Sequence, residues 1–220
     1  MNCNAAKMKR NPGMERRLQR ARAFVATLLF LCLTGIIAAE HLLAQEAPSL
    51  AGQLLVAAPD MGDPRFIDTV IFIVRHNGNG AMGLVINRPL AKGSLSHFLR
   101  RLGVESKNAR GEIVLHYGGP VEPARAFVLH TTDYTSRDTT VVSEGLAITT
   151  DLGIMQAIGQ GKGPKRSIFC VGYAGWAPGQ LEAEMKADAW FSIPAEDKLI
   201  FEGDPETKWE KAMARRRIKA

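Results

Sequence analysis

Short runs of apolar, β-favouring residues recur along the chain from about residue 50, and turn-forming residues separate them. The first two runs, residues 54–58 and 69–74, flank a segment that contains Pro59, Gly62 and Pro64. Such runs, bounded by glycine and proline, indicate strands joined by loops. By the same reasoning we predict further strands at residues 81–86, 113–117, 126–130, 139–142, 146–148, 167–173 and 190–193.

The Asn/Gly-rich residues 76–80 predict a β-hairpin between two of these strands, because asparagine and glycine tolerate a positive φ. Apolar residues three and four positions apart predict a short helix over 94–102. Further helices are expected at 151–158 with Thr150 as its cap, at 180–188, and from Asp204-Pro205 onward. Strands outnumber helices and follow one another as hairpin neighbours. The pattern therefore predicts a single α+β domain with a mixed, antiparallel-rich sheet and three to four short helices.

The charge of the chain is concentrated at its beginning. The 220 residues contain 28 Lys and Arg against 22 Asp and Glu, and residues 1–45 hold seven of the basic and two of the acidic groups. The remainder, with 21 basic and 20 acidic groups, is almost neutral and has no helix-turn-helix pattern. Both features argue against a nucleic-acid partner. We expect the partner to be a protein or a small molecule.

Residues 23–39 form an uncharged apolar run directly after an arginine-rich stretch. A basic region, an apolar region and then small residues such as Ala44 are typical of a secretory signal. The run is also near the lower limit of about 17–25 residues for a membrane span. We expect residues 1–45 to be a signal peptide or N-terminal membrane anchor, which places the protein in the periplasm or on the inner membrane. It is cytoplasmic if these 45 residues result from a start codon assigned too early.

Familiar catalytic and cofactor motifs are absent from the sequence or stand in the wrong context. Residues 78–83 match G-x-G-x-x-G, but they continue into a predicted strand rather than the helix that a dinucleotide site needs. The histidines show no metal-ligand spacing, although His116 and His130 could face each other across paired strands. Cys170 lies in an apolar run and is expected to be a buried hydrophobe, and Glu182 and Glu184 to be solvated. We therefore expect no cofactor and no metal.

Two stretches predict a binding groove. Asn87-Arg88-Pro89 places a bidentate donor at the end of a strand, and residues 172–176 bring two aromatic side chains into a glycine-permitted turn before the 180–188 helix. The alternative is structural: Arg88 pairs with a carboxylate such as Asp63 to hold loops together, and Trp176 fills the core. The candidate groove residues are Asp63, His76, Asn87, Arg88, Tyr173, Trp176 and Gln180.

The sequence resembles the AlgH/YqgE family of bacterial proteins. The resemblance covers residues 50–212 and rests on LLVAAPDMGDPRFIDTVIFIVRHNGNGAMGLVINRP, HYGGPV, FVLH, GLAITTD, GYAGWAPGQLEAE and AWFSIP. It implies an α+β domain, here residues 50–215, around a strongly bent mixed sheet, and no established activity or cofactor. The family's naming member is described as a proposed regulator of alginate production. The motif positions in this chain are Pro59, Asp63, Pro64, Phe66, His76, Gly80, Gly83, Asn87, Arg88, Pro89, Gly118, Gly119, Pro120, Tyr173, Gly175, Trp176, Gln180, Leu181 and Glu182.

These observations favour a non-enzymatic binding or regulatory protein that acts through the groove near Asn87-Arg88 and Tyr173–Trp176. One alternative is a hydrolase or transferase in which Asp63, His76 and Arg88 serve as base, acid and anion clamp. Another is a transcriptional regulator, if the chain is cytosolic. No residue is assigned a catalytic role from the sequence.

Overall fold

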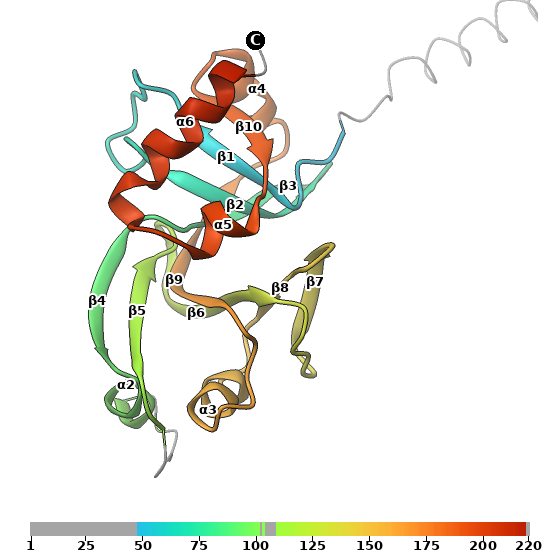
Figure 1. The fold of residues 1–220 in the computed structure, drawn as a ribbon. Helices are drawn as coiled ribbons and strands as arrows, with labels where there is room; N and C mark the ends of the chain where they lie inside the picture. The colour runs from blue at the N-terminus through green and yellow to red at the C-terminus, as the bar shows by residue number, and fades with distance from the viewer. Residues whose placement is uncertain (1–47, 102, 104–108, 219–220) are drawn as a thin grey trace, which may run out of the picture. The chain divides into compact units, whose positions relative to one another are not determined.

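The computed structural model describes residues 48–101, 103 and 109–218. The predicted signal peptide or anchor lies outside this part of the chain. Ten strands form one curled sheet (Figure 1) in the order β10-β1-β2-β3-β9-β6-β8-β7, with β4 joined through β5 to β9. The strands are β1 (Gln53–Ala57), β2 (Val70–Asn77), β3 (Gly80–Val85), β4 (Pro89–Ser94), β5 (Glu112–Tyr117), β6 (Val121–Thr131), β7 (Thr139–Ser143), β8 (Leu146–Thr149), β9 (Ser167–Trp176) and β10 (Trp190–Pro194).

All strand pairs are antiparallel except β5 with β9, so the sheet is mixed and antiparallel-rich. The predicted α+β class with a bent sheet is confirmed. The described helices are α2 (Leu95–Arg101), α3 (Gly153–Gly159), α4 (Gln180–Lys186), α5 (Asp197–Phe201), α6 (Lys208–Ile218) and the short 3₁₀ helix η1 (Pro205–Thr207). None of the helices in the described ranges is both long and apolar enough to span a membrane.

Helices cover both faces of the sheet around β1, which is why this strand is buried along almost its whole length. Leu54 pairs with Phe72 and points into the core beneath α6. Leu55 pairs with Ile71 and points into the core on the opposite face, where Leu181 of α4 packs. Successive side chains of a strand alternate between faces, so one continuous apolar run supplies two separate cores.

The hairpin between β2 and β3 forms as predicted, with Asn77 paired to Gly80, whose φ is +105°. Because the chain continues from Gly80 into β3, the G-x-G-x-x-G pattern has no helix beside it. Asp204 is an N-cap as predicted, but of the short 3₁₀ helix η1 that leads into α6: its side chain accepts a hydrogen bond from the backbone N–H of Glu206.

The predicted turn at residues 172–176 is wrong, because these residues are the end of the long strand β9. One end of β9 pairs with β5 and β6, and the other end pairs with β3. Gly172 has a φ of +71°, and a Cβ on Gly119 would lie 2.2 Å from the carbonyl carbon of Tyr173. The glycines therefore serve a close approach of two backbones and not a reversal of the chain.

Two other predictions need correction. β9 lies between β5 and β6, so His116 and His130 do not face each other. The N-cap of α3 is Leu152 rather than Thr150, and the Asp151 carboxylate accepts from the N–H of Gly153 instead. The strand β4 and the helix α5 were not expected. β4 begins with a proline and has no buried residue, and α5 has five residues, too few to show a helical period.

Candidate functional site

A cavity of about 380 Å³ lies between the loop that follows β1, the helix α4 and the adjoining ends of β9 and β10. We call it the tryptophan pocket. Three aromatic and four polar residues characterise its lining: Phe66, Trp176, Trp190, Asp63, Arg65, Gln180 and Glu184. Of the predicted groove residues, the structure brings Asp63, Trp176 and Gln180 together here.

The carboxylate of Glu184 organises the pocket. Its Oε2 atom accepts hydrogen bonds from the indole N–H of Trp176 at 2.9 Å and of Trp190 at 2.8 Å. Its Oε1 atom accepts from the Gln180 side-chain amide at 2.8 Å, and the Gln180 carbonyl oxygen accepts from the backbone of Ala177. The sequence predicted that Glu184 is a solvated surface residue, and this prediction is wrong. Buried indole donors need such a partner, and a charged acceptor makes the stronger bond.

The aromatic rings meet edge to face and so present walls at steep angles to one another. Trp190 lies between Trp176, with ring centroids 6.0 Å apart and planes at 82°, and Phe66, at 5.5 Å and 68°. Trp176 and Trp190 are almost fully buried, whereas Phe66 is half-buried. The packing alternative is thus correct for the indole of Trp176, which fills the core and also lines the pocket.

Asp63 is paired within its own loop and not with Arg88. The Arg65 guanidinium contacts both carboxylate oxygens of Asp63, at distances down to 2.6 Å. This contact holds the pKa of Asp63 below its usual value and raises the pKa of Arg65. Two carboxylates and one guanidinium therefore line the pocket, which leaves its lining one negative charge in excess.

Asn87 and Arg88 lie outside the pocket but hold the loop that forms one of its walls. The Asn87 side chain donates to the carbonyl oxygen of Asp68 and accepts from the N–H of Val70, both at 2.8 Å. Arg88 donates to the carbonyl oxygen of Ile67 at 2.5 Å. Asp68 has a φ of +54°, a conformation that L-residues adopt with strain. Arg88 does hold a loop in place, as the structural alternative predicted. Its hydrogen-bond partner is the backbone carbonyl oxygen of Ile67 and not the carboxylate of Asp63.

His76 holds the helix α4, which forms the wall of the pocket that carries Gln180 and Glu184. Its Nδ1 atom accepts from the backbone N–H of Leu50 at 3.0 Å, so the ring hydrogen is on Nε2, which donates to Glu182 Oε1 at 2.8 Å. The pKa of Glu182 is lowered, first by its own backbone N–H and then by His76. Because Glu182 and Glu184 both belong to α4, the contact with His76 anchors the helix that carries the pocket carboxylate.

Tyr173 does not join Trp176. Residues three apart in a strand lie on opposite faces, so Tyr173 packs in the core beneath α6, while Trp176 packs in the core that faces α4. The Tyr173 hydroxyl donates to Glu122 at 3.1 Å. The residues of the predicted groove therefore do not form one site. Some line the tryptophan pocket, while Asn87, Arg88 and His76 hold its walls in place, and Tyr173 lies on the other side of the sheet.

The three groups of the predicted hydrolase have separate partners. Within the described ranges, no hydrogen bond or ion pair joins any two of Asp63, His76 and Arg88. The same residues contain no group of three or more His, Cys, Asp or Glu that could hold a metal ion. Cys170 is buried as predicted, and burial raises the pKa of its thiol to about 12, so it is not a nucleophile near neutral pH.

Sequence reasoning missed Glu184 and Trp190 as pocket residues. Both stand in the stretches that carry the family resemblance, GQLEAE and AWFSIP, which was the available signal. Their joint role could not be inferred, because the hydrogen bond connects a helix to the strand β10 through side chains alone.

The chain belongs to the AlgH-like family, whose model matches residues 54–220. It is 44% identical over 166 residues to a UPF0301 protein of Rhodospirillum rubrum, which covers 76% of this chain and 86% of the relative. A UPF0301 protein of Caulobacter vibrioides is 43% identical over 174 residues, covering 78% and 89%. The resemblance found in the sequence is thereby confirmed.

Two solved structures share the fold. The solution structure of the AlgH protein from Pseudomonas aeruginosa has a TM-score of 0.65 at 40% identity, covering 79% of this chain and 92% of that one. A crystal structure of a Corynebacterium diphtheriae protein has a TM-score of 0.60 at 22% identity, covering 80% and 91%. These similarities define family and fold but name no reaction, ligand or partner.

Proposed function

We propose that this chain is a non-enzymatic binding protein whose tryptophan pocket takes up an alkylammonium group, from a small molecule or from a lysine of a partner protein. The observation that carries the proposal is the Glu184 carboxylate held between the indoles of Trp176 and Trp190. The pocket combines aromatic walls with one excess negative charge, and organic cations are attracted by both.

The arrangement suits binding more than catalysis. A catalytic carboxylate needs a position from which it can exchange a proton with a substrate. Glu184 instead receives three hydrogen bonds, which hold it in place and occupy both of its oxygen atoms. The braces at Asn87 and His76 fix the two walls, so the pocket is preformed and binding costs little ordering entropy.

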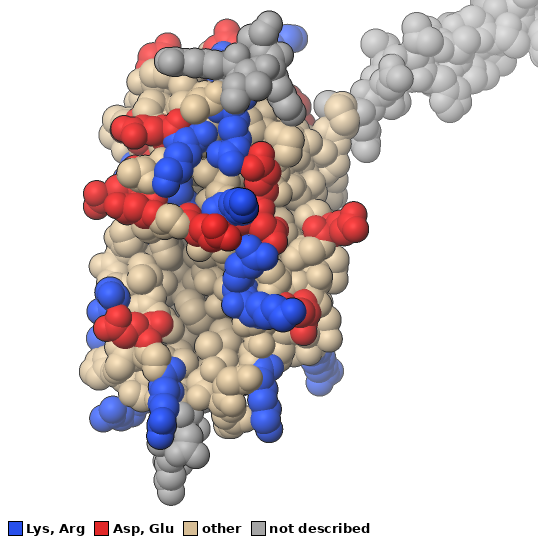
Figure 2. All heavy atoms as spheres, in the orientation of Figure 1, with Lys and Arg blue, Asp and Glu red and all other residues tan. Residues whose placement is uncertain are grey.

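The surface gives no support to DNA binding as the activity. On the face drawn in Figure 2, Lys and Arg side chains alternate with Asp and Glu over the upper part and stand apart from one another at the lower end, so they form no continuous basic stripe. Together with the near-neutral charge of residues 46–220, this removes the electrostatic footprint that a phosphate backbone requires. The location of the protein stays a prediction.

The three tryptophans provide a test with an internal control. Trp176 and Trp190 line the pocket, whereas the Trp209 indole donates to the carbonyl oxygen of Ala57 at 2.8 Å on the other face of the sheet. In the ¹⁵N-labelled full-length chain, tetramethylammonium chloride should shift the first two indole signals and leave the third unchanged. Sodium chloride at the same ionic strength should shift none. Equal shifts of all three, or no shift, would overturn the proposal.

A second arm uses the peptide acetyl-Gly-Lys-Gly-amide. Binding of the peptide alone indicates a protein side chain as the natural ligand, and binding of tetramethylammonium alone indicates a small molecule. The Glu184→Gln variant keeps the shape of the side chain and removes its charge, so affinity should fall about tenfold or more, as for one charged contact. Glu206→Gln, at an exposed glutamate of η1, is the matched control and should leave binding unchanged.

A further inference from the structure

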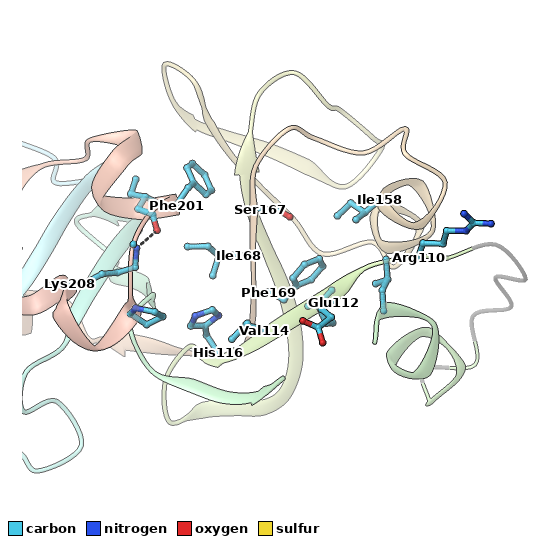
Figure 3. A pocket seen from close by; sticks show the side chains of 15 residues that line it. Arg110, Glu112, Val114, His116, Ile158, Ser167, Ile168, Phe169, Phe201 and Lys208 are labelled. Carbon is cyan, nitrogen blue, oxygen red and sulfur yellow. Dashed lines mark hydrogen bonds between the residues drawn. The ribbon is translucent and has the colours of Figure 1, made fainter. Parts of the chain in front are cut away.

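A second cavity, of about 360 Å³, lies between β5, β9 and the C-terminal elements α5, η1 and α6 (Figure 3). We call it the His116 cavity. Its volume falls within the range of about 300–1,000 Å³ that is usual for small-molecule sites. It shares no lining residue with the tryptophan pocket, so a ligand of the His116 cavity is independent of the alkylammonium site.

The walls of the His116 cavity combine apolar side chains with polar ones. Its apolar lining includes Val114 of β5, Ile158 of α3, Ile168 and Phe169 of β9, and Phe201 of α5. Ile168 and Phe169 are almost fully buried. Ile168 packs in the core beneath α6, whereas the next residue of β9, Phe169, packs in a separate core with α2 and α3. Val114 and Ile168 therefore share a side, and this side offers an apolar chain a surface.

A buried lysine closes one end of the cavity. The Lys208 Nζ atom donates to the carbonyl oxygens of Leu199, Ile200 and Glu202, each at 2.8 Å, and so caps the end of α5. Burial lowers the pKa of Lys208 to about 8, which leaves it mostly charged at neutral pH. No ion pair of Lys208 exists within the described ranges, although buried charges are ordinarily paired.

His116 stands next to this charge with an unused hydrogen-bonding atom. The residue is 6% exposed, and its Nδ1 atom has no hydrogen-bond partner in the part of the chain that the structure describes. Figure 3 shows the ring between Lys208 on one side and Val114 and Phe169 on the other. Burial lowers the pKa of His116; the nearby backbone groups of Phe169 and Val114 oppose this shift, and the charge of Lys208 adds a small further lowering. A buried polar atom without a partner is rare and needs an explanation.

We infer that the His116 cavity binds a small amphipathic carboxylate. Its head group accepts a hydrogen bond from the His116 ring beside the Lys208 ammonium, and its apolar chain lies along Val114 and Ile168. The carboxylate supplies a hydrogen-bond partner to the His116 ring and a counter-charge close to Lys208. Among the described residues, only the Asp204 and Glu202 carboxylates act on this lysine, without forming an ion pair. At the other end of the cavity, Glu112 is paired with Lys92 at 2.9 Å and is exposed, so it does not compete for the lysine.

The probe for the test is sodium octanoate, and the readout is the ¹³C-methyl spectrum of the full-length chain. The methyl signals of Ile168 and Ile200, which line the cavity, should shift on titration, while those of Ile71 and Ile73 in the core facing α4 should not. Octanol and octylamine, which have the same chain without a negative head group, should bind at least tenfold more weakly.

His116→Phe keeps a ring of similar size and removes the hydrogen-bonding atom. Octanoate affinity should fall tenfold or more, the loss expected for one hydrogen bond to a charged group. His97→Phe, at an exposed histidine of α2, is the matched control and should bind normally. Equal binding of octanoate and octanol, retained affinity in His116→Phe, or unshifted Ile168 and Ile200 signals would each overturn the inference.

Discussion

The tryptophan pocket and the His116 cavity have similar volumes but differ in whether their polar side chains have side-chain hydrogen-bond partners. In the first, the Glu184 carboxylate accepts from three side-chain donors, and both indole N–H groups are satisfied. In the second, His116 Nδ1 has no hydrogen-bond partner among the described residues and the buried Lys208 has only backbone carbonyls. A group whose partner is removed costs its full desolvation energy, whereas removing a group that has no partner costs nothing. Substitutions in the two regions should therefore change stability by different amounts.

The largest effect is expected at Trp176. Trp176→Ala removes a nearly buried indole from the core and should lower the free energy of unfolding by about 3–5 kcal/mol. Urea denaturation, compared with wild type at constant m, measures the loss. A loss below about 1 kcal/mol would show that the indole is not part of the packed wall, and the preformed character of the pocket would then be wrong.

The second-largest loss of stability is expected at Glu184, and it should exceed the loss at Glu182 of the same helix, α4. Glu184→Ala leaves two buried indole N–H groups without an acceptor and should cost about 2–4 kcal/mol. Glu182→Ala removes one half-exposed partner of His76 and should cost about 1 kcal/mol or less. Both values come from the same denaturation experiment, and equal losses would contradict the role assigned to Glu184.

The loop brace gives an intermediate effect. Asn87→Ala leaves the Asp68 carbonyl and the Val70 N–H without their partner and should cost about 1–3 kcal/mol. It should also weaken tetramethylammonium binding, because the loop carries Phe66. Arg88→Ala loses one exposed contact to Ile67, and its smaller cost provides the comparison. If Asn87→Ala lowers stability and leaves the affinity intact, the loop does not set the geometry of the pocket.

The smallest effect is expected at His116. His116→Phe should change the free energy of unfolding by no more than about 1 kcal/mol at pH 7, since no hydrogen bond is lost. A loss above about 2 kcal/mol would show that His116 has a partner in the folded protein.

The same variant tests the acid sensitivity of this region. The pKa of His116 is lower in the folded protein than the usual value of about 6.5, so the unfolded chain takes up a proton first as the pH falls. Stability should therefore decrease with falling pH through about 6.5, and His116→Phe should weaken this dependence. Burial lowers the pKa of His130 too, so part of the dependence should remain. Thermal unfolding at several pH values measures both, and an unchanged slope would contradict the assignment.

Local patterns in the sequence were sufficient for most of the elements. The β2–β3 hairpin, the helix after Ser94 and the Asp204 cap depend on residues near one another in the chain, so propensity and capping rules find them. The turn predicted at residues 172–176 failed because the same glycines that permit a turn also permit a close backbone approach within a strand. Only the position of Gly119 against Tyr173 distinguishes the two cases.

The candidate site also combines features that the local sequence indicates with features that depend on contacts between distant segments. The sequence by itself determined the α+β class, the family and the near-neutral charge of the domain, and it named Asp63, Trp176 and Gln180 as candidate site residues. Only the tertiary structure decided which of them meet. It placed Tyr173 on the far face of the sheet, made His76 and Asn87 braces, and joined Glu184 to Trp190. The physical reason is that strand alternation and side-chain hydrogen bonds between distant elements depend on register and packing, which no local pattern encodes.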